Sequence, residues 1–233
     1  MREVEDRHWW YRSLRENVWD AWAGLPHQDL PLLDIGCGTG GMLSGAPCRA
    51  IGIDLSGEAL RFCRGRGRRL LTRGDAASLP FRDESFSGAL MLDVLYHRAV
   101  SDPPGVLREA RRVIAPGGYV IVNVPAYEWL RSSHDDAIHT ARRFTRPELA
   151  SMLTSAGFGI VRLTYWNTLM FPVAAAVRLA RRHGRRGLSD LADSNDGPAA
   201  QVAGFALAVE RALMRYVNLP FGLSVFAVAQ KPR

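Results

Sequence analysis

An apolar run ends in a glycine-rich turn within residues 32–41, which read LLDIGCGTGG. Glycine lets the backbone turn tightly, and it lets a ligand approach the backbone without a Cβ in the way. The segment fits the dinucleotide pattern G-x-G-x-x-G and also the pattern D-x-G-x-G-x-G, whose fixed positions are Asp34, Gly36, Gly38 and Gly40. A turn of this kind predicts a site for a nucleotide-like cofactor at the carboxyl end of a β-strand.

Three acidic residues distinguish between the two patterns. Asp54 closes the second predicted strand, 20 residues after Asp34, where a carboxylate can accept hydrogen bonds from both hydroxyls of an adenosine ribose. Asp75 follows the third predicted strand, where it can accept from the exocyclic amine of an adenine. Asp34 lies beside the glycine turn, where its charge would repel a pyrophosphate and favour the ammonium end of an aminoacyl cofactor. The acids favour S-adenosylmethionine over NAD, although any one of them alone could be a helix N-cap or a surface residue.

Short apolar runs alternate with helical stretches along most of the chain. The 233 residues are 47% hydrophobic, which is typical of a globular domain. The predicted strands are 32–35, 50–54, 70–73, 87–92, 119–124, 160–165 and 223–229, and the predicted helices are 4–22, 40–46, 56–65, 103–114 and 146–156. Such alternation predicts an α/β fold, with a doubly wound, mostly parallel sheet that helices cover on both faces.

Two segments flank the predicted core, which spans residues 30–130. Residues 1–24 form an aromatic helix that acts as a lid over the cofactor or docks as an ordinary amphipathic helix. Residues 131–233 belong to the same domain and supply a substrate-side loop, the sixth strand and the last strand. Between those two strands, 168–183 and 199–217 are predicted as two helices. They either enlarge the core or form a substrate lid or a membrane-facing hairpin.

The charge and the cysteine content limit the kinds of partner and the cellular compartment that we expect. The net charge is +7, but only Lys231 of the 30 basic residues is a lysine, which indicates a GC-rich genome rather than selection for phosphate contacts. The basic clusters at 61–69 and 178–186 lack the interleaved aromatics that stack on bases, so nucleic acid is not expected as a partner, while peripheral membrane contact stays open. Three cysteines make no disulfide framework, and the first residues do not resemble a signal peptide, so we expect a cytoplasmic protein.

Five segments together resemble the class I S-adenosylmethionine-dependent methyltransferases of the small-molecule type. They are LDIGCGTG at 33–40, GIDLS at 52–56, GDAASLPF at 74–81, LDVLYH at 92–97 and LREARRVIAPGGYV at 107–120. The resemblance implies seven strands, with the last one antiparallel, and a cofactor at the switch point of the sheet. It implies cofactor contacts from Asp34, Gly36, Cys37, Gly38, Gly40, Asp54, Leu55, Asp75, Ala76, Leu92 and Asp93. Tyr11 of the N-terminal helix would add an aromatic face toward the sulfonium.

The flanks are similar to one branch of that family. The segments HWWYR at 8–12 and 134–148 match it, but Tyr96 stands where the branch has an acid, and His139-Thr140 replaces a His-His or Gly-His pair. Any acid or base role carried over onto those two positions is therefore open.

Histidines are the candidate general bases. Methyl transfer is an in-line displacement, so the enzyme mainly aligns the nucleophile and removes its proton. A base with a pKa near neutrality suits that task, and His97, His134 and His139 lie at the substrate edge of the predicted sheet. The alternatives are a helix cap for His97, and loop-ordering hydrogen bonds or a His/Asp/His metal site for the other two. We expect no metal requirement.

Four more residues are candidates for contact with the methyl acceptor. Tyr127 and Trp129 follow the fifth predicted strand and could form pocket walls. Arg142 and Arg143 could hold a carboxylate or phosphate in a bidentate fork, or else form salt bridges. The sequence thus predicts methyl transfer to an oxygen or nitrogen of a small molecule, in a specialised-metabolite or cell-envelope pathway. The alternatives are an RNA methyltransferase and a protein that uses the cofactor only as a scaffold for another reaction.

Overall fold

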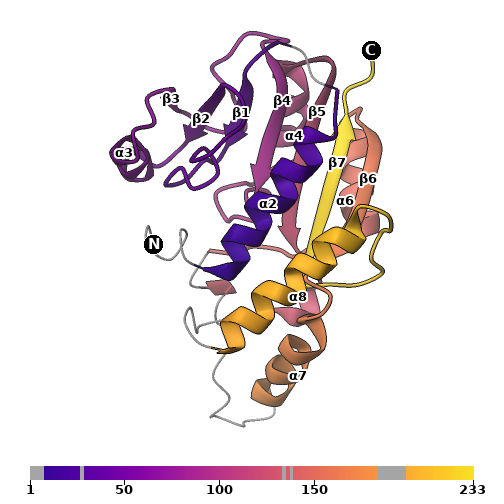
Figure 1. Ribbon diagram of the computed structural model, residues 1–233. Helices are drawn as coiled ribbons and strands as arrows, with labels where there is room; N and C mark the ends of the chain where they lie inside the picture. Colours follow the sequence, from indigo (N-terminus) through magenta and orange to yellow (C-terminus); the bar gives the residue numbers. More distant parts are fainter. Residues whose placement is uncertain (1–7, 27–28, 133–134, 137–138, 183–197) are drawn as a thin grey trace.

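One seven-stranded sheet organises the computed structural model, which describes residues 8–26, 29–132, 135–136, 139–182 and 198–233 (Figure 1). The strand order is β3-β2-β1-β4-β5-β7-β6. The strands are β1 (Leu32–Ile35), β2 (Ala50–Asp54), β3 (Leu71–Arg73), β4 (Phe86–Leu92), β5 (Ile114–Pro125), β6 (Gly159–Trp166) and β7 (Ser224–Gln230). Strands β1 to β5 run parallel to one another, whereas β7 runs antiparallel to both β5 and β6. The predicted α/β fold is confirmed.

Helices cover both faces of this sheet. They are α2 (Trp9–Ala23), α3 (Gly57–Gly65), α4 (Pro103–Val113), the 3₁₀ turn η1 (Glu128–Leu130), α6 (Arg146–Ser155), α7 (Phe171–Arg182) and α8 (Pro198–Met214). Leu33 and Ile35 of β1 pack with α4 and α6 in one hydrophobic cluster. Leu32, on the opposite face, packs with α2 and α8 in a second cluster. A strand buried on both faces needs apolar side chains in succession, which explains Leu32, Leu33 and Ile35 in β1, with Asp34 as the exception.

The predicted helix at 40–46 is wrong. The segment forms a series of turns, with only Ser44 N donating to Gly40 O in a helical pattern. Gly40 and Gly45 have φ values of 81° and 93°, and this left-handed conformation interrupts a right-handed helix. A side chain at Gly40 would also collide with the sulfur of Cys63, so the close approach of α3 fixes the turn at that point.

The chain between β6 and β7 forms the two predicted helices. Leu207 and Met214 of α8 are buried against α2 and the sheet, so α8 is part of the core as well as an insertion (Figure 1). The polar stretch predicted between the helices, 184–198, lies outside the described residues except for Pro198. In the described part of the chain, no helix is long and apolar enough to cross a bilayer.

Candidate cofactor and methyl-acceptor site

The glycine turn leaves β1 with its backbone facing open space. Gly36 N and Cys37 N both donate to Ile53 O, at 2.8 and 3.0 Å, which ties the turn to β2. Cys37 is buried beneath the turn. Gly38 has a φ of 54°, and a Cβ built there would meet no atom within 4 Å. The turn therefore offers a backbone surface that a ligand can approach closely.

Asp34 is a buried carboxyl with an unsatisfied oxygen beside this turn. Its side chain is 2% exposed, and its Oδ2 atom is buried without a hydrogen-bond partner among the described residues. Burial, with smaller contributions from the nearby Cys63 and Asp54, raises the pKa of Asp34 to about 8. A buried carboxyl of this kind is satisfied best by a cation or a strong donor that enters from the glycine turn.

Asp54 joins the glycine turn to the end of β2. Its Oδ2 accepts from Gly38 N at 2.8 Å, and its Oδ1 accepts from Ser56 N at 2.8 Å. Leu55, the next residue, is 55% exposed, as an apolar wall of a ligand site would be. Beyond β3, Asp75 accepts from Ala77 N at 2.9 Å, and Ala76 packs partly buried against the main core.

Asp93 follows β4 at the same edge of the sheet, next to the predicted contact Leu92. It adopts a φ of 61°, which is uncommon for a residue other than glycine. Asn123 of β5 holds it from two sides, because Asn123 Nδ2 donates to Asp93 Oδ1 at 3.0 Å and Asp93 N donates to Asn123 O at 3.0 Å. Trp166 Nε1 donates to Asn123 Oδ1 at 2.7 Å and fixes the amide orientation. Burial raises the pKa of Asp93 and the Asn123 hydrogen bond opposes this effect, with a net pKa of about 7.

The N-terminal helix reaches this network through its aromatic residues. Trp10 stacks on Trp166, with ring centroids 5.7 Å apart, and Tyr11 lies edge-on to Trp10 at 4.9 Å. Burial raises the pKa of Tyr96 above its usual range, and the nearby Asp93 and Tyr11 raise it further. Tyr11 and Asp93 thus both act electrostatically on the Tyr96 phenol.

Two of the three predicted histidines lie together. The rings of His97 and His139 are 5.8 Å apart and edge-on, and the segments that carry them pair between His97 and Thr140. His97 Nδ1 accepts from Ala99 N at 3.1 Å, which leaves Nε2 as the ring nitrogen without a described partner. Burial lowers the pKa of His97, and the neighbouring His139 lowers it further. His134 lies outside the described residues.

Arg143 is engaged in a buried ion pair. Its Nε and Nη2 atoms donate to the two carboxylate oxygens of Asp135, at 2.8 and 3.0 Å, and Nη1 donates to Ala126 O at 2.9 Å. The side chains of Arg143 and Asp135 are only 5% and 0% exposed. Arg142 makes one long hydrogen bond, of 3.4 Å, to Val100 O. Arg143 thus orders the loop after β5, whereas Arg142 retains donors for another partner.

Aromatic rings border the loop after β5. Tyr127 has a φ of 55°, and its ring stacks on Tyr165 at 5.1 Å. Trp129 lies 5.9 Å from both Tyr127 and Phe171 and is 43% exposed. The described residues contain no group of three His, Cys, Asp or Glu side chains arranged as metal ligands.

Comparison with known proteins identifies the family to which the chain belongs. Residues 33–122 match the family model described as "Methyltransferase domain". The chain is 31% identical over 190 residues to a demethylmenaquinone methyltransferase of Tropheryma whipplei (strain Twist), covering 64% of this chain and 74% of that protein. This chain belongs to the class I S-adenosylmethionine-dependent methyltransferases.

Other relatives are similar to this chain over a shorter part of their own length. An Arabidopsis thaliana tRNA (carboxymethyluridine(34)-5-O)-methyltransferase is 33% identical over 111 residues, covering 47% of this chain and 26% of that protein. The chain spans from about a quarter to about half the length of the first three relatives it matches. The solved complex between the Haloferax volcanii Trm112 methyltransferase activator and its methyltransferase has the same fold, with a TM-score of 0.64, 21% identity and coverage of 100% of this chain and 93% of that one.

The residues present fit S-adenosylmethionine, the cofactor of this methyltransferase family. The unpartnered Oδ2 of Asp34 is a ready acceptor for the ammonium of the methionine moiety. Gly38 leaves the close approach free, and Asp54 is positioned to receive the ribose hydroxyls at the end of β2.

Sequence reasoning missed Asn123 and Trp166. Asn123 is fully buried, and it stands within the otherwise apolar run VIVNVP of β5. A lone polar residue in a buried strand needs a hydrogen-bond partner, so it could have been recognised as a sign of a functional edge. The pairing with Trp166 could not, since it depends on β7 inserting between β5 and β6.

Proposed function

We propose that this chain transfers the methyl group of S-adenosylmethionine to an oxygen or nitrogen atom of a small molecule. The observation that carries the proposal is the buried, unpartnered Asp34 oxygen beside the open glycine turn, with His97 and Asp93 following the adjacent strand. An acid that binds the cofactor and groups that titrate near neutrality then lie at one edge of the sheet.

The bound cofactor supplies an activated methyl group on its sulfonium. Asp34 and Asp54 orient it from below the glycine turn, and Leu55 and Ala76 border the adenosine. Tyr11 on α2 covers the methyl-donor side and excludes water. The aromatic side chains of Tyr127 and Trp129 form a wall against which an organic acceptor can rest.

The proton of the acceptor goes to a histidine. His97 Nδ1 is already engaged with Ala99 N, so Nε2 is the atom that would accept the proton. The lowered pKa of His97 keeps its ring neutral at pH 7, which is the form a base requires. His139 lies beside it and is the alternative base, and His134 precedes His139 by five residues in the sequence. Arg142 would bind an anionic group of the acceptor, while Arg143 supports the loop through Asp135.

Methylation of tRNA is the second candidate function. It is favoured by the similarity to the Arabidopsis thaliana tRNA methyltransferase, which covers about half of this chain. The similarity to the demethylmenaquinone methyltransferase covers more of both proteins and favours a small acceptor. Transfer of the acceptor's proton to His97 is compatible with either substrate.

Transfer of radiolabelled methyl groups tests these alternatives. The protein is incubated with labelled S-adenosylmethionine and either a panel of phenols, catechols and amines or unmodified tRNA. We expect label in at least one small-molecule class and none in tRNA. Label in tRNA alone would replace the proposal with the second candidate. Cofactor binding with no transfer to either panel would support the scaffold hypothesis.

A further inference from the structure

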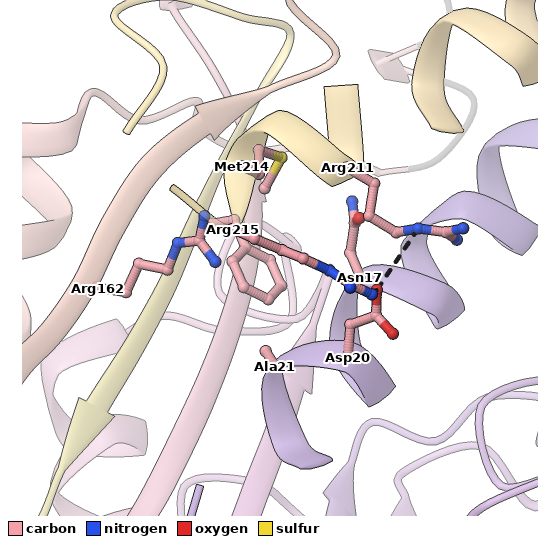
Figure 2. Close-up of a pocket in the computed structure, with 8 residues that line it drawn as sticks. Asn17, Asp20, Ala21, Arg162, Arg211, Met214 and Arg215 are labelled. Carbon is pink, nitrogen blue, oxygen red and sulfur yellow. Dashed lines mark hydrogen bonds and ion pairs between the residues drawn. The ribbon is translucent and has the colours of Figure 1, made fainter. Parts of the chain in front are cut away.

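A second cavity lies away from the cofactor site, between α2, α8 and the last two strands of the sheet. Its volume is about 130 Å³. Figure 2 shows Arg162 extending from β6 on one side, with Asn17 and Asp20 of α2 on the other. Arg162 is level with Asp34 through the strand register, but three strands lie between β6 and β1, which makes four strand-to-strand spacings. At about 4.8 Å per strand, the separation is roughly 19 Å, so this cavity is distinct from the glycine site.

The lining of the cavity has an excess of positive charge. Arg162, Arg211 and Arg215 contribute three guanidinium groups, and Asp20 contributes the one lining carboxylate. Glu16 of α2, just outside the lining, forms an ion pair with Arg211, which leaves an excess of one positive charge. Asp20 is already engaged, because Arg215 Nη2 lies 2.9 Å and Arg211 Nε 3.5 Å from its Oδ2. The guanidinium of Arg162, by contrast, has no hydrogen bond or ion pair with any residue that the structure describes. Burial lowers its pKa, as expected for a cation that lacks a compensating anion.

Asn17 adds an unsatisfied acceptor to the same cavity. Its side chain is 6% exposed, and its Oδ1 atom is buried without a hydrogen-bond partner in the described ranges. Buried polar atoms in proteins are nearly always hydrogen-bonded, and each exception calls for an explanation. A ligand that donates a hydrogen bond to Asn17 Oδ1 would satisfy this buried acceptor.

These two needs define the ligand chemistry. Arg162 requires anionic oxygens, for which the planar guanidinium fork is well matched. Asn17 Oδ1 requires a donor on the same small ligand. A carboxylate or a sulfate offers no donor at neutral pH, whereas inorganic phosphate keeps a P–OH group. A metal cation is disfavoured by the three guanidinium groups.

We infer that this cavity binds a phosphoryl group accompanied by a hydroxyl, with Arg162 donating to its anionic oxygens and Asn17 Oδ1 accepting from its hydroxyl. Inorganic phosphate is the simplest such ligand, and a phosphate ester with a neighbouring hydroxyl has the same chemistry. Such a site goes beyond the proposed methyl transfer and does not depend on it.

Calorimetric titration of the full chain at pH 7, saturated with S-adenosylhomocysteine, tests the site with phosphate, sulfate and glycerol 3-phosphate. We expect phosphate to bind at least about tenfold more tightly than sulfate, because sulfate leaves Asn17 without a donor. Tighter binding of glycerol 3-phosphate than of phosphate would identify an ester as the natural ligand, and the reverse would identify the free ion.

Two variants and one control sharpen the test. Arg162→Gln should weaken phosphate and sulfate by at least about tenfold each, since both need the guanidinium. Asn17→Leu should abolish the preference for phosphate over sulfate without lowering the melting temperature. Arg108→Gln, in an exposed ion pair with Asp102 on α4, should change neither affinity.

Three results would each overturn the inference. The wild type could bind phosphate and sulfate equally, or Arg162→Gln could bind phosphate as tightly as the wild type. The third result is that the wild type shows no binding at about 10 mM phosphate. Arg162→Gln should keep its affinity for S-adenosylhomocysteine. If the wild type itself does not bind S-adenosylhomocysteine, the proposed function is contradicted. The phosphate titrations would then be made on the protein without that ligand, and they would still test the phosphate site.

Discussion

Removing the guanidinium of Arg143 should destabilise the protein strongly. Asp135 is completely buried, and in the Arg143→Met variant its carboxylate would lose two charge-assisted hydrogen bonds while keeping only those from Ser132. Leaving one charge of a buried pair without its partner costs about 3–5 kcal/mol of unfolding free energy. For a chain of this size, each kcal/mol lowers the melting temperature by about 2–4 °C, so a fall of roughly 6–20 °C is expected.

Urea denaturation and thermal melts of the purified variants measure this effect. Arg98→Ala is the matched control, because Arg98 pairs with Asp136, the next residue along, at 3.2 Å with side chains 57% and 71% exposed. An exposed pair of this kind contributes about 0–1 kcal/mol. The double variant Arg143→Met/Asp135→Asn should recover part of the loss, since it removes the buried charge. Equal destabilisation by Arg143→Met and Arg98→Ala would refute the reasoning.

Acidification should also remove the contribution of this pair. Burial by itself raises the pKa of Asp135, but the hydrogen bonds and charge of Arg143 hold it below its ordinary value. A carboxyl with a depressed folded-state pKa stabilises above its unfolded pKa of about 3.9, and that stability is lost as the pH falls through the folded value. The difference in stability between the wild type and Arg143→Met should therefore shrink below about pH 4.

Three other predictions concern the site itself. Asp54→Ala should weaken S-adenosylhomocysteine binding at least about tenfold in calorimetry, because it would remove the proposed acceptor of two ribose hydroxyls; unchanged affinity would contradict this role. Since the pKa of Asp93 is raised to about 7, the folded state holds a proton that the unfolded state releases, so stability should fall as the pH rises from about 4 to 7, and Asp93→Asn should flatten that slope in pH-dependent urea melts. His97→Ala should lower turnover by about 10²- to 10⁴-fold with little change in cofactor affinity, and full activity in this variant would exclude His97 as the base.

The sheet could be predicted because its strands satisfy local rules. Strands β2 and β4 are mostly apolar runs bounded by turn residues, and the alternation with helices fixes the parallel arrangement. The helix predicted at 40–46 failed for a reason that is not local. Gly40 is held in a left-handed conformation by the packing of Cys63 from α3, which periodicity does not record.

The positions of candidate site residues could be predicted where a single residue at the end of a strand is concerned. Asp34, Asp54 and Asp75 fall at the carboxyl ends of successive strands, so their convergence follows from the topology. The buried pair of Arg143 with Asp135 joins residues eight positions apart across an irregular loop, and spacing rules for helices and strands do not apply there. The same limit applies to Asn123 and Trp166, whose contact needs the strand order β5-β7-β6.

Proton release on cofactor binding tests the central claim most directly. The pKa of Asp34 is raised to about 8, so its carboxyl is largely protonated at pH 7, and an ammonium bound against it must drive the proton off. Calorimetry of S-adenosylhomocysteine binding in buffers of different ionisation enthalpy counts that proton. We predict micromolar affinity, about −8 kcal/mol, with close to one proton released by the wild type and none by Asp34→Asn. Binding of NAD in place of S-adenosylhomocysteine, or binding without proton release and without any effect of Asp34→Asn, would contradict the account.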